Sequence, residues 1–157
     1  MHGGIKLKLS GMMTSNHNDW ATPKNLFDEL NKEFNFTLDF CANKENTKCL
    51  RFYSKEDNAL IQNPKNEVIF CNPPYGREIS KFIKKLFELS KNNKIVMLIP
   101  ARTDTSYWHN YIQGKAEVRF IRGRVKFEGL NGKGEFIKGK PSTFPSVIIV
   151  FETQKGV

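Results

Sequence analysis

A four-residue segment, Asn72-Pro73-Pro74-Tyr75, combines an amide side chain, two rigid residues and an aromatic ring. Each proline fixes its own φ and disfavours helix in the residue before it, so the backbone of this segment is rigid. The side-chain oxygen of Asn72 and the carbonyl oxygen of Pro73 are therefore two hydrogen-bond acceptors in a fixed relation. Beside an aromatic face, they suit a planar NH2 group. The alternative is a rigid turn in which Asn72 caps and Tyr75 packs.

The chemistry that this segment favours is methylation of an amino group on a nucleobase. Such an amine is a poor nucleophile because its lone pair is delocalised into the ring. Two acceptors that take hydrogen bonds from both of its N–H groups draw the nitrogen toward tetrahedral geometry. They also stabilise the positive charge that develops as the nitrogen attacks a methyl group. Tyr75 would stack on a base rotated out of a duplex, which offsets part of the few kcal/mol that unstacking costs. Asn72, Pro73, Pro74 and Tyr75 are the candidate catalytic residues.

The elements that must position this loop alternate along the chain. Short apolar runs predict strands at 36–40, 68–71, 95–99, 118–121 and 146–151, with a weaker signal at 49–53. Helical spacing predicts helices at 23–34, after a cap at Thr22, and at 79–89. Such alternation predicts an α/β fold, with a mostly parallel twisted sheet flanked by helices. Ligands bind such sheets beyond the carboxyl ends of the strands. Asp39, Asn72 and Pro100 fall at those ends, so we expect one shared crevice.

Length and charge limit the remaining choices. A chain of 157 residues fits one domain, which we expect at 19–157 after a flexible leader at 1–18. The net charge of +9 favours a polyanionic partner, with nucleic acid first, although excess lysine can also serve solubility alone. A glycine-rich loop is expected at 129–139. It would either enter a nucleic-acid groove or lack order.

Several classes of site and location are not indicated. The three cysteines, Cys41, Cys49 and Cys71, have neither disulfide-framework nor zinc spacing, which favours a reducing cytoplasm. His109 has no second ligand at helical spacing, so no metal site is expected. No apolar run approaches the length of a membrane span, and no signal peptide is evident.

Basic and aromatic residues gather late in the chain. The aromatic residues include Trp108 and Tyr111, and the basic ones are Arg102, Arg119, Arg122, Arg124 and Lys126. Their interleaving is typical of a nucleic-acid surface, on which we expect Arg102 and Arg124 to contact the substrate. The aromatic residues could equally pack a helix.

Six ordered blocks of sequence resemble the bacteriophage-type DNA N-6-adenine methyltransferases, across most of residues 20–151. The blocks are Trp20-Ala21-Thr22-Pro23, Leu38-Asp39-Phe40-Cys41-Ala42, Asp57-Asn58-Ala59-Leu60, Asn72-Pro73-Pro74-Tyr75-Gly76, Ile99-Pro100-Ala101-Arg102-Thr103-Asp104-Thr105 and Arg122-Gly123-Arg124-Val125-Lys126-Phe127. The resemblance implies a class I (Rossmann-like) fold, S-adenosylmethionine as methyl donor and adenine in double-stranded DNA as acceptor. It also suggests a phage role, such as protection from restriction.

The resemblance also implies roles for individual residues. It assigns cofactor binding to Trp20, Thr22, Pro23, Asp39, Cys41 and Ala42, with Asp57 at the adenosine end, and it places Phe127 opposite Tyr75 on the flipped base. For Asp39 the assignment has a physical basis, because a carboxylate at a strand end accepts hydrogen bonds from ribose hydroxyls or an ammonium. The alternative for Asp39 is a turn cap.

The chain departs from the usual methyltransferase pattern at the cofactor loop. Asp39 is followed by Phe-Cys-Ala-Asn instead of a glycine-rich turn. About thirty residues separate Asp39 from Asn72, too few for two full strand-helix units, so we expect a missing or rudimentary helix there. Two other functions stay open: methylation of an RNA base or a protein glutamine, and a nucleic-acid-binding module with a degenerate cofactor site. The recognised DNA sequence and the oligomeric state are not predicted.

Overall fold

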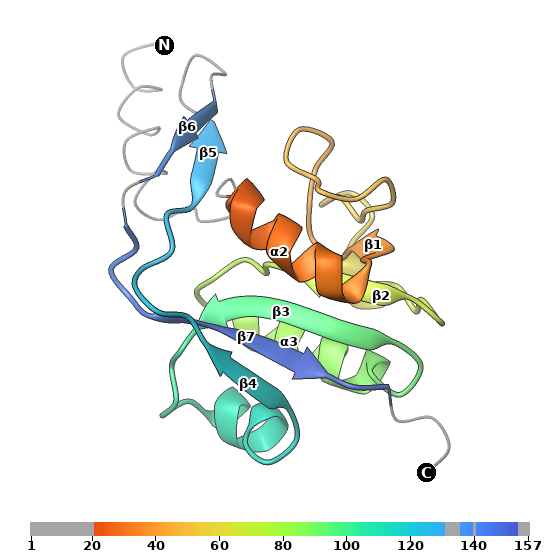
Figure 1. The fold of residues 1–157 in the computed structure, drawn as a ribbon. Coiled ribbons are helices and arrows are strands. Elements are labelled where there is room, and N and C mark those ends of the chain that lie inside the picture. The colour runs from red at the N-terminus through yellow and green to blue at the C-terminus, as the bar shows by residue number, and fades with distance from the viewer. Residues whose placement is uncertain (1–20, 131–135, 140, 154–157) are drawn as a thin grey trace, which may run out of the picture.

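A computed structural model describes residues 21–130, 136–139 and 141–153 (Figure 1). The leader expected at 1–18, and Trp20, lie outside the described residues. Five strands form one sheet in the order β1-β2-β3-β7-β4. Their bounds are Leu38–Asp39 for β1, Val68–Cys71 for β2, Lys94–Pro100 for β3, Ser146–Phe151 for β7 and Glu117–Phe120 for β4.

The direction of the strands confirms the mostly parallel α/β sheet. β1 and β2 are parallel, as are β2 and β3, whereas β7 is antiparallel to both β3 and β4. Four of the five strands therefore run the same way. In register, Asp39 pairs with Phe70 and Cys71 pairs with Met97, so β1 and β2 end at the same edge. Asn72 follows directly from β2 at that edge.

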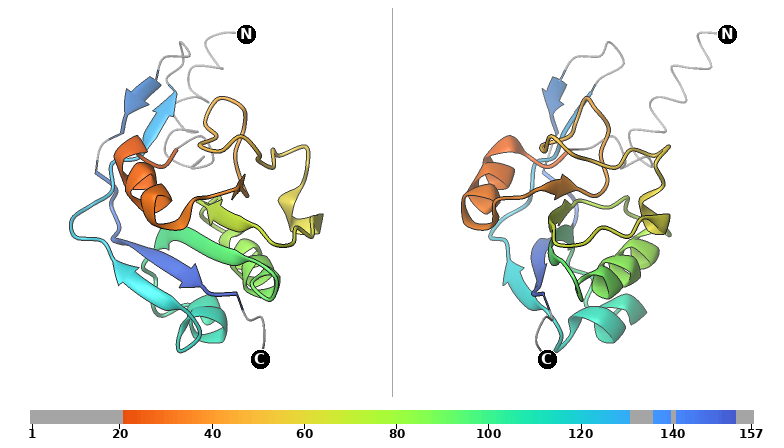
Figure 2. Two further views of the ribbon diagram at one scale, coloured as in Figure 1. Left: turned by 45° about the vertical axis from the view of Figure 1, so that its right-hand side comes forward. Right: turned by 90° about the vertical axis from the view of Figure 1, so that its right-hand side faces the viewer.

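Helices cover both faces of the sheet (Figure 2). Helix α2, Lys24–Phe34, packs on one face, and helix α3, Ile79–Leu89, packs on the other together with the π-helical turn η3, Trp108–Ile112. Alternate residues of β3 divide between the two cores: Met97 contributes to the α3 side and Leu98 to the α2 side. Because both faces are buried, the strand is apolar throughout instead of alternating with polar residues.

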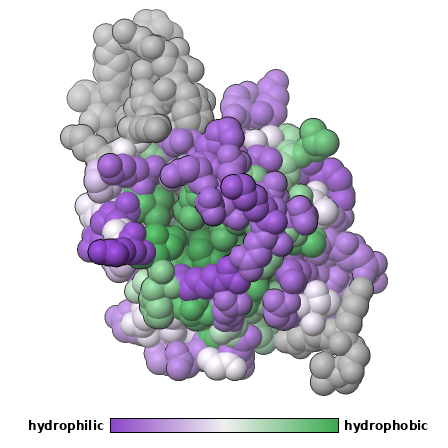
Figure 3. Space-filling view, in the orientation of Figure 1, coloured by the Kyte–Doolittle hydropathy of each residue, from purple (hydrophilic) through white to green (hydrophobic). Residues whose placement is uncertain are grey.

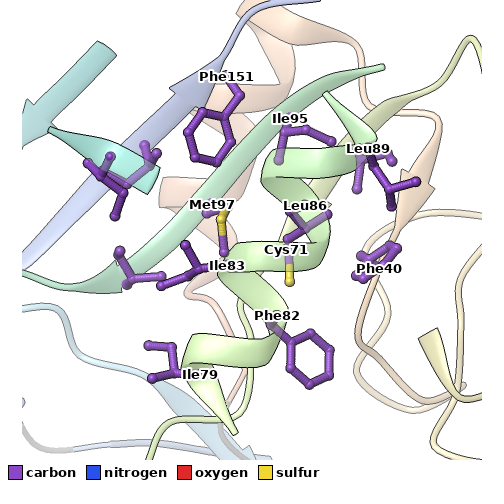
Figure 4. Close-up of a cluster of buried hydrophobic side chains, with 14 of the residues drawn as sticks. Phe40, Cys71, Ile79, Phe82, Ile83, Leu86, Leu89, Ile95, Met97 and Phe151 are labelled. Carbon is purple, nitrogen blue, oxygen red and sulfur yellow. The ribbon is translucent and has the colours of Figure 1, made fainter. Parts of the chain in front are cut away.

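The core between the sheet and α3 is the larger of the two (Figure 4). Ile79, Ile83 and Leu86 recur at helical spacing on α3 and share one buried cluster with Cys71 of β2 and Met97 of β3. This packing fixes the helix that follows the predicted catalytic loop. It therefore holds the loop from its carboxyl-terminal side, while β2 holds it from the other.

Helix α2 begins one residue later than the sequence predicted. Pro23, not Thr22, precedes the first helical residue, and the helix ends at Asn35, which adopts a left-handed φ of 54°. The side-chain oxygen of Asn31 accepts a hydrogen bond from the Phe36 N–H at 2.8 Å, which stabilises the turn into β1. Thr22 is thereby left outside the helix, next to the end of the sheet.

The segment between Asp39 and β2 has little regular structure, as expected. Instead of the strand predicted at 49–53, the described residues form one parallel bridge, Asp39 to Phe52, with the Tyr53 N–H donating to the Asp39 carbonyl at 3.0 Å. The helical content is a short 3-10 helix, η2, Ala59–Ile61. The prediction of a rudimentary helix is confirmed.

The glycine-rich segment differs from the predicted loop. It contains two short antiparallel strands, β5, Glu128–Leu130, and β6, Phe136–Lys138, while 131–135 lie outside the described residues. Backbone pairing between strands was not anticipated, because glycine is poor in β propensity and the segment lacks alternation. None of the helices in the described part of the chain is long and apolar enough to cross a membrane.

Candidate active site

A small cavity of about 30 Å³ lies at the carboxyl ends of β1 and β2. Its lining combines four residues predicted to bind a cofactor with two residues of the predicted catalytic loop. The full lining is Ala21, Thr22, Asp39, Cys41, Ala42, Asn46, Lys48, Phe70, Asn72 and Pro74. Segments that are far apart in the sequence therefore meet at the sheet edge, where the order of the elements predicted a crevice.

Asp39 is the buried acidic group of this cavity, with 4% of its surface exposed. Its carboxylate accepts two long backbone hydrogen bonds, from the Cys41 N–H at 3.5 Å and the Lys48 N–H at 3.3 Å. Burial raises the pKa of Asp39 from 3.8 to about 7, because the loss of hydration outweighs these bonds and the charge of Lys48. A ligand that brings hydrogen-bond donors or a positive charge would stabilise the ionised form.

Lys48 of this cavity forms an ion pair with Glu128, a residue that lines a second, wider hollow. The Lys48 ammonium lies 3.8 Å from Glu128 Oε1, and the two side chains are only 18% and 10% exposed. Glu128 Oε2 accepts a hydrogen bond from the Lys24 N–H, the first residue of α2, at 3.4 Å. The backbone of Glu128 also pairs with Ala21 in an antiparallel bridge. Glu128 thus joins the cofactor loop, the start of α2 and the segment that carries Phe127.

Asn46, Lys48 and Glu128 were not among the residues predicted for the site. Asn46 and Lys48 belong to the polar loop after Asp39. Their position directly beyond the end of a strand could have identified them as site residues from the sequence. For Glu128 no local signal exists, because its partners in the described residues lie far away in the sequence.

The predicted catalytic loop runs from β2 toward α3. Pro73 is buried and Asn72 is half-buried at the cavity. Gly76 adopts a φ of 91°, a left-handed conformation that favours glycine, and it lets the chain turn into α3. The Tyr75 hydroxyl donates a hydrogen bond to the Leu98 carbonyl at 3.3 Å, and burial raises the pKa of this phenol. Strand β3 therefore holds the ring of Tyr75.

The rings of Tyr75, Phe127 and Phe144 contact one another. Tyr75 lies edge-to-face against both phenylalanines, with centroids 6.0 Å from Phe127 and 5.7 Å from Phe144. The structure thus brings Tyr75 and Phe127 together, as the sequence suggested, but in direct contact and with no space between them for a base. Phe144 was not predicted. It precedes a proline and a buried strand, and nothing in that local pattern identifies it.

Of the two predicted substrate arginines, Arg102 lies beside these rings, whereas Arg124 contacts the backbone of Ser142. The Arg102 guanidinium carbon is 5.9 Å from the centroid of Phe144, within cation–π range. Arg124 donates from Nη1 to the Ser142 carbonyl at 3.4 Å. Both side chains are exposed, so their charges are accessible to a polyanion.

Two predicted cofactor residues lie apart from the small cavity. Asp57 accepts hydrogen bonds from the N–H and the hydroxyl of Ser54 at 2.8 and 3.0 Å, in a local turn. Pro23 lines a different, wider hollow of about 850 Å³ between α2 and residues 121–128. In the orientation of Figure 1, the surface of this face is hollowed, with hydrophobic side chains on its floor and hydrophilic ones around it (Figure 3).

Other members of the basic and aromatic group have structural contacts. Arg119 forms two hydrogen bonds of 2.7 Å with the Glu33 carboxylate and thereby connects β4 with α2. Trp108 is buried in the core under α3, and Tyr111 packs on Phe87 with centroids 5.4 Å apart. For these aromatic residues the packing alternative is correct. Within the described residues, no group of three His, Cys, Asp or Glu side chains is placed to hold a metal ion.

Comparison with known proteins identifies the family. A family model described as DNA N-6-adenine-methyltransferase (Dam) matches residues 10–156. The DNA N-6-adenine-methyltransferase of Escherichia phage T1 is 37% identical over 105 residues, which make up 65% of this chain and 44% of the phage protein. The enzyme of the same name from Haemophilus phage HP1 is 28% identical over 137 residues, 85% of this chain and 78% of that protein. The chain spans less than half the length of the first relative.

Among solved structures, the chain resembles a SAM-dependent O-methyltransferase from Thermotoga maritima, with a TM-score of 0.39 and 10% identity over 68% of this chain and 42% of that one. The family match covers nearly the whole described fold and includes all six blocks that carried the resemblance. The resemblance to phage enzymes is confirmed, and the α/β sheet agrees with the class I methyltransferase fold that it implied. The chain belongs to the DNA N-6-adenine-methyltransferase (Dam) family.

Proposed function

We propose that this protein transfers a methyl group from S-adenosylmethionine to the exocyclic amine of adenine in double-stranded DNA, at sites whose sequence is still to be measured. One observation supports this more than any other. Asn72 and Pro74 of the catalytic loop line the same cavity as the buried carboxylate of Asp39. An acceptor loop for an amine and a polar site for a methyl donor are thus adjacent at the sheet edge.

The chemistry of the cavity fits the proposed donor. S-adenosylmethionine supplies a methyl group on a sulfonium, and it carries an ammonium, a carboxylate and ribose hydroxyls. Thr22, Asp39, Asn46 and Lys48 offer the complementary acceptors and donors. A cavity of about 30 Å³ has room for about one water molecule. Residues 42–48 must therefore move outward when the cofactor binds.

The residues of the catalytic loop would act on the amine. The Asn72 side-chain oxygen and the Pro73 carbonyl would each accept a hydrogen bond from one of its N–H groups and stabilise the positive charge that grows on the nitrogen. Because these acceptors are fixed by two prolines and by β2, little reorganisation is needed during the reaction. One proton leaves to water after transfer, so no strong base is required.

The DNA side of the site would lie around the aromatic group. Arg102, which lies over Phe144, and Arg124, which contacts Ser142, are both exposed and can neutralise phosphates. For an adenine to stack on Tyr75 opposite Phe127, the two rings must first separate, because they now touch. We assign the catalytic unit to residues 19–157 and place the reaction in the cytoplasm of the host cell, where DNA and cofactor are both available.

The test is a methylation assay with purified protein. Unmethylated duplex DNA and cofactor are incubated with the protein, digested to nucleosides and analysed for N-6-methyladenine by mass spectrometry. Asn72→Ala should lower turnover by about 100-fold or more, because one charge-stabilising acceptor is lost. Asn92→Ala is the matched control, since Asn92 is exposed before β3, at the opposite end of that strand from the site.

Three outcomes would contradict the proposal. Methyl groups found only in RNA or in a protein glutamine would assign another substrate to the same loop. Absence of cofactor binding would identify a nucleic-acid-binding module. Full activity of Asn72→Ala on DNA would remove the catalytic loop from the mechanism.

A further inference from the structure

Lys48 and Asp39 bring a basic and an acidic residue to the lining of the cofactor cavity. Both residues line it, and the backbone N–H of Lys48 donates to Asp39 Oδ2 at 3.3 Å. The positive charge of Lys48 is also close enough to Asp39 to favour the ionised form of the carboxyl group. An amino-acid group, which carries an ammonium and a carboxylate on the same carbon, has the complementary pair of charges.

The ion pair between Lys48 and Glu128 is long. The distance between Lys48 Nζ and Glu128 Oε1 is 3.8 Å, longer than a charge-assisted hydrogen bond, and both side chains are largely removed from solvent. A carboxylate that approached the Lys48 ammonium more closely would have a stronger electrostatic interaction with it than Glu128 has. In such an exchange one carboxylate replaces another, so the Lys48 ammonium keeps a buried counter-charge.

Glu128 also keeps other contacts when Lys48 turns away. Its second carboxylate oxygen accepts from the Lys24 N–H at the start of α2, where the helix dipole favours a negative charge. Its backbone is fixed by the bridge to Ala21. The acid can therefore stay in place without its lysine partner, as an exchange of partners requires.

We propose that Lys48 binds the carboxylate of the methionine part of S-adenosylmethionine and that Asp39 binds its ammonium. Glu128 then forms its ion pair with Lys48 only while the cavity is empty. This proposal rests on the proposed function and adds the orientation of the donor. It also gives a physical reason for the outward movement of residues 42–48, since Lys48 exchanges a partner within the protein for one on the ligand.

The test compares two ligands that differ only in the carboxylate: S-adenosylmethionine and its decarboxylated analogue, each titrated by calorimetry. The wild-type protein should bind the analogue about 10-fold or more weakly, because a hydrogen bond to a charged group is lost. Lys48→Met should weaken the binding of S-adenosylmethionine by a similar factor and change the affinity for the analogue by no more than about twofold. Lys48→Arg should keep part of the discrimination between the ligands.

Two further variants separate binding from support of the fold. Lys44→Met removes an exposed lysine from the same loop and should change neither affinity. Glu128→Gln removes the competing charge while its amide oxygen can still accept from Lys24, so it should bind S-adenosylmethionine as tightly as the wild type or tighter.

The outcomes are distinct. If the wild type binds neither ligand, the proposed function fails. If it binds both equally, or if Lys48→Met weakens both equally, the methyltransferase proposal stands and the role of Lys48 is refuted. A large loss of affinity in Glu128→Gln would show that the pair supports the cavity instead of yielding to the ligand. Should Lys48→Met not fold, the comparison of the two ligands on the wild type still tests the proposal.

Discussion

The Tyr75 hydroxyl donates a hydrogen bond to the backbone carbonyl of Leu98 at 3.3 Å, so the aromatic residue of the catalytic loop is fixed to the neighbouring strand. The ring is also held by Phe127 and Phe144. The orientation of Tyr75 is therefore set by β3 and by the segments that carry Phe127 and Phe144, and not by the loop alone. Removing the hydroxyl and removing the ring should have different effects.

Tyr75→Phe should lower the free energy of unfolding by about 1 kcal/mol, since one neutral hydrogen bond is lost while the ring contacts remain. Turnover should fall by less than about tenfold, because the stacking surface persists. Tyr75→Ala should destabilise the protein by about 3 kcal/mol and abolish most turnover. Denaturant unfolding and the nucleoside assay measure the two effects. A large loss of turnover in Tyr75→Phe, without loss of stability, would assign the hydroxyl a direct catalytic role.

Asp39→Asn should stabilise the protein most at alkaline pH. The pKa of Asp39 is raised to about 7 by burial, so between about pH 4 and pH 7 the folded protein holds a proton that the unfolded chain releases. The stability of the wild type attributable to this group therefore falls as pH rises through that range. The gain in Tm of Asp39→Asn should be larger at about pH 8 than at about pH 5. Equal gains at both values would place the carboxylate in a more hydrated site.

Cofactor affinity should rise with pH through about 7. The ionised form of Asp39 is the one that an ammonium stabilises, whereas the protonated form, present below its pKa, must first lose its proton. Calorimetry at several pH values, in buffers with different ionisation enthalpies, measures both the affinity and the protons released. In Asp39→Asn the affinity should be weaker and this pH dependence should disappear. A pH-independent wild type would argue against contact with Asp39.

Arg124 and Arg119 should differ in their effects on DNA binding. Arg124→Gln should weaken DNA binding and reduce the slope of log affinity against log salt concentration by about 1, as expected for the loss of one phosphate contact. Arg119→Gln should leave that slope unchanged, because the guanidinium is engaged by Glu33, and should lower thermal stability instead. Fluorescence anisotropy across a salt series and thermal melts measure these effects. The opposite pattern would indicate that DNA binds to the surface of β4, which carries Arg119.

The cysteines should be nearly inert to alkylation in the folded protein. Burial raises the pKa of Cys41 and Cys49 to about 12, with a further contribution from Asp39, and raises that of Cys71 well above its usual value. At about pH 8 the thiolate fraction is then on the order of 0.0001. Iodoacetamide should modify the native protein at least about 100-fold more slowly than the unfolded chain. Rapid labelling of native Cys49, seen by mass spectrometry, would mean that its loop opens often.

Local sequence was sufficient for the elements that carry the catalytic loop. The limits of β2, α3 and β7 agree with the predicted ranges, because continuous apolar runs and helical spacing are properties of neighbouring residues. The position of Asn72 and Asp39 at one edge followed from the parallel direction of their strands. The family resemblance likewise required only the order of short motifs.

Long-range contacts were beyond such reasoning. Glu128 meets the start of α2 across 104 positions, and Arg119 meets Glu33 across 86. The charge of each residue is visible in the sequence, but its partner depends on how β4, β5 and α2 pack. The same holds for Asp39, whose pKa is set by burial and not by its residue type. Sequence therefore specified which chemical groups are present, whereas distance and exclusion of water, which arise only on folding, specified which of them act together.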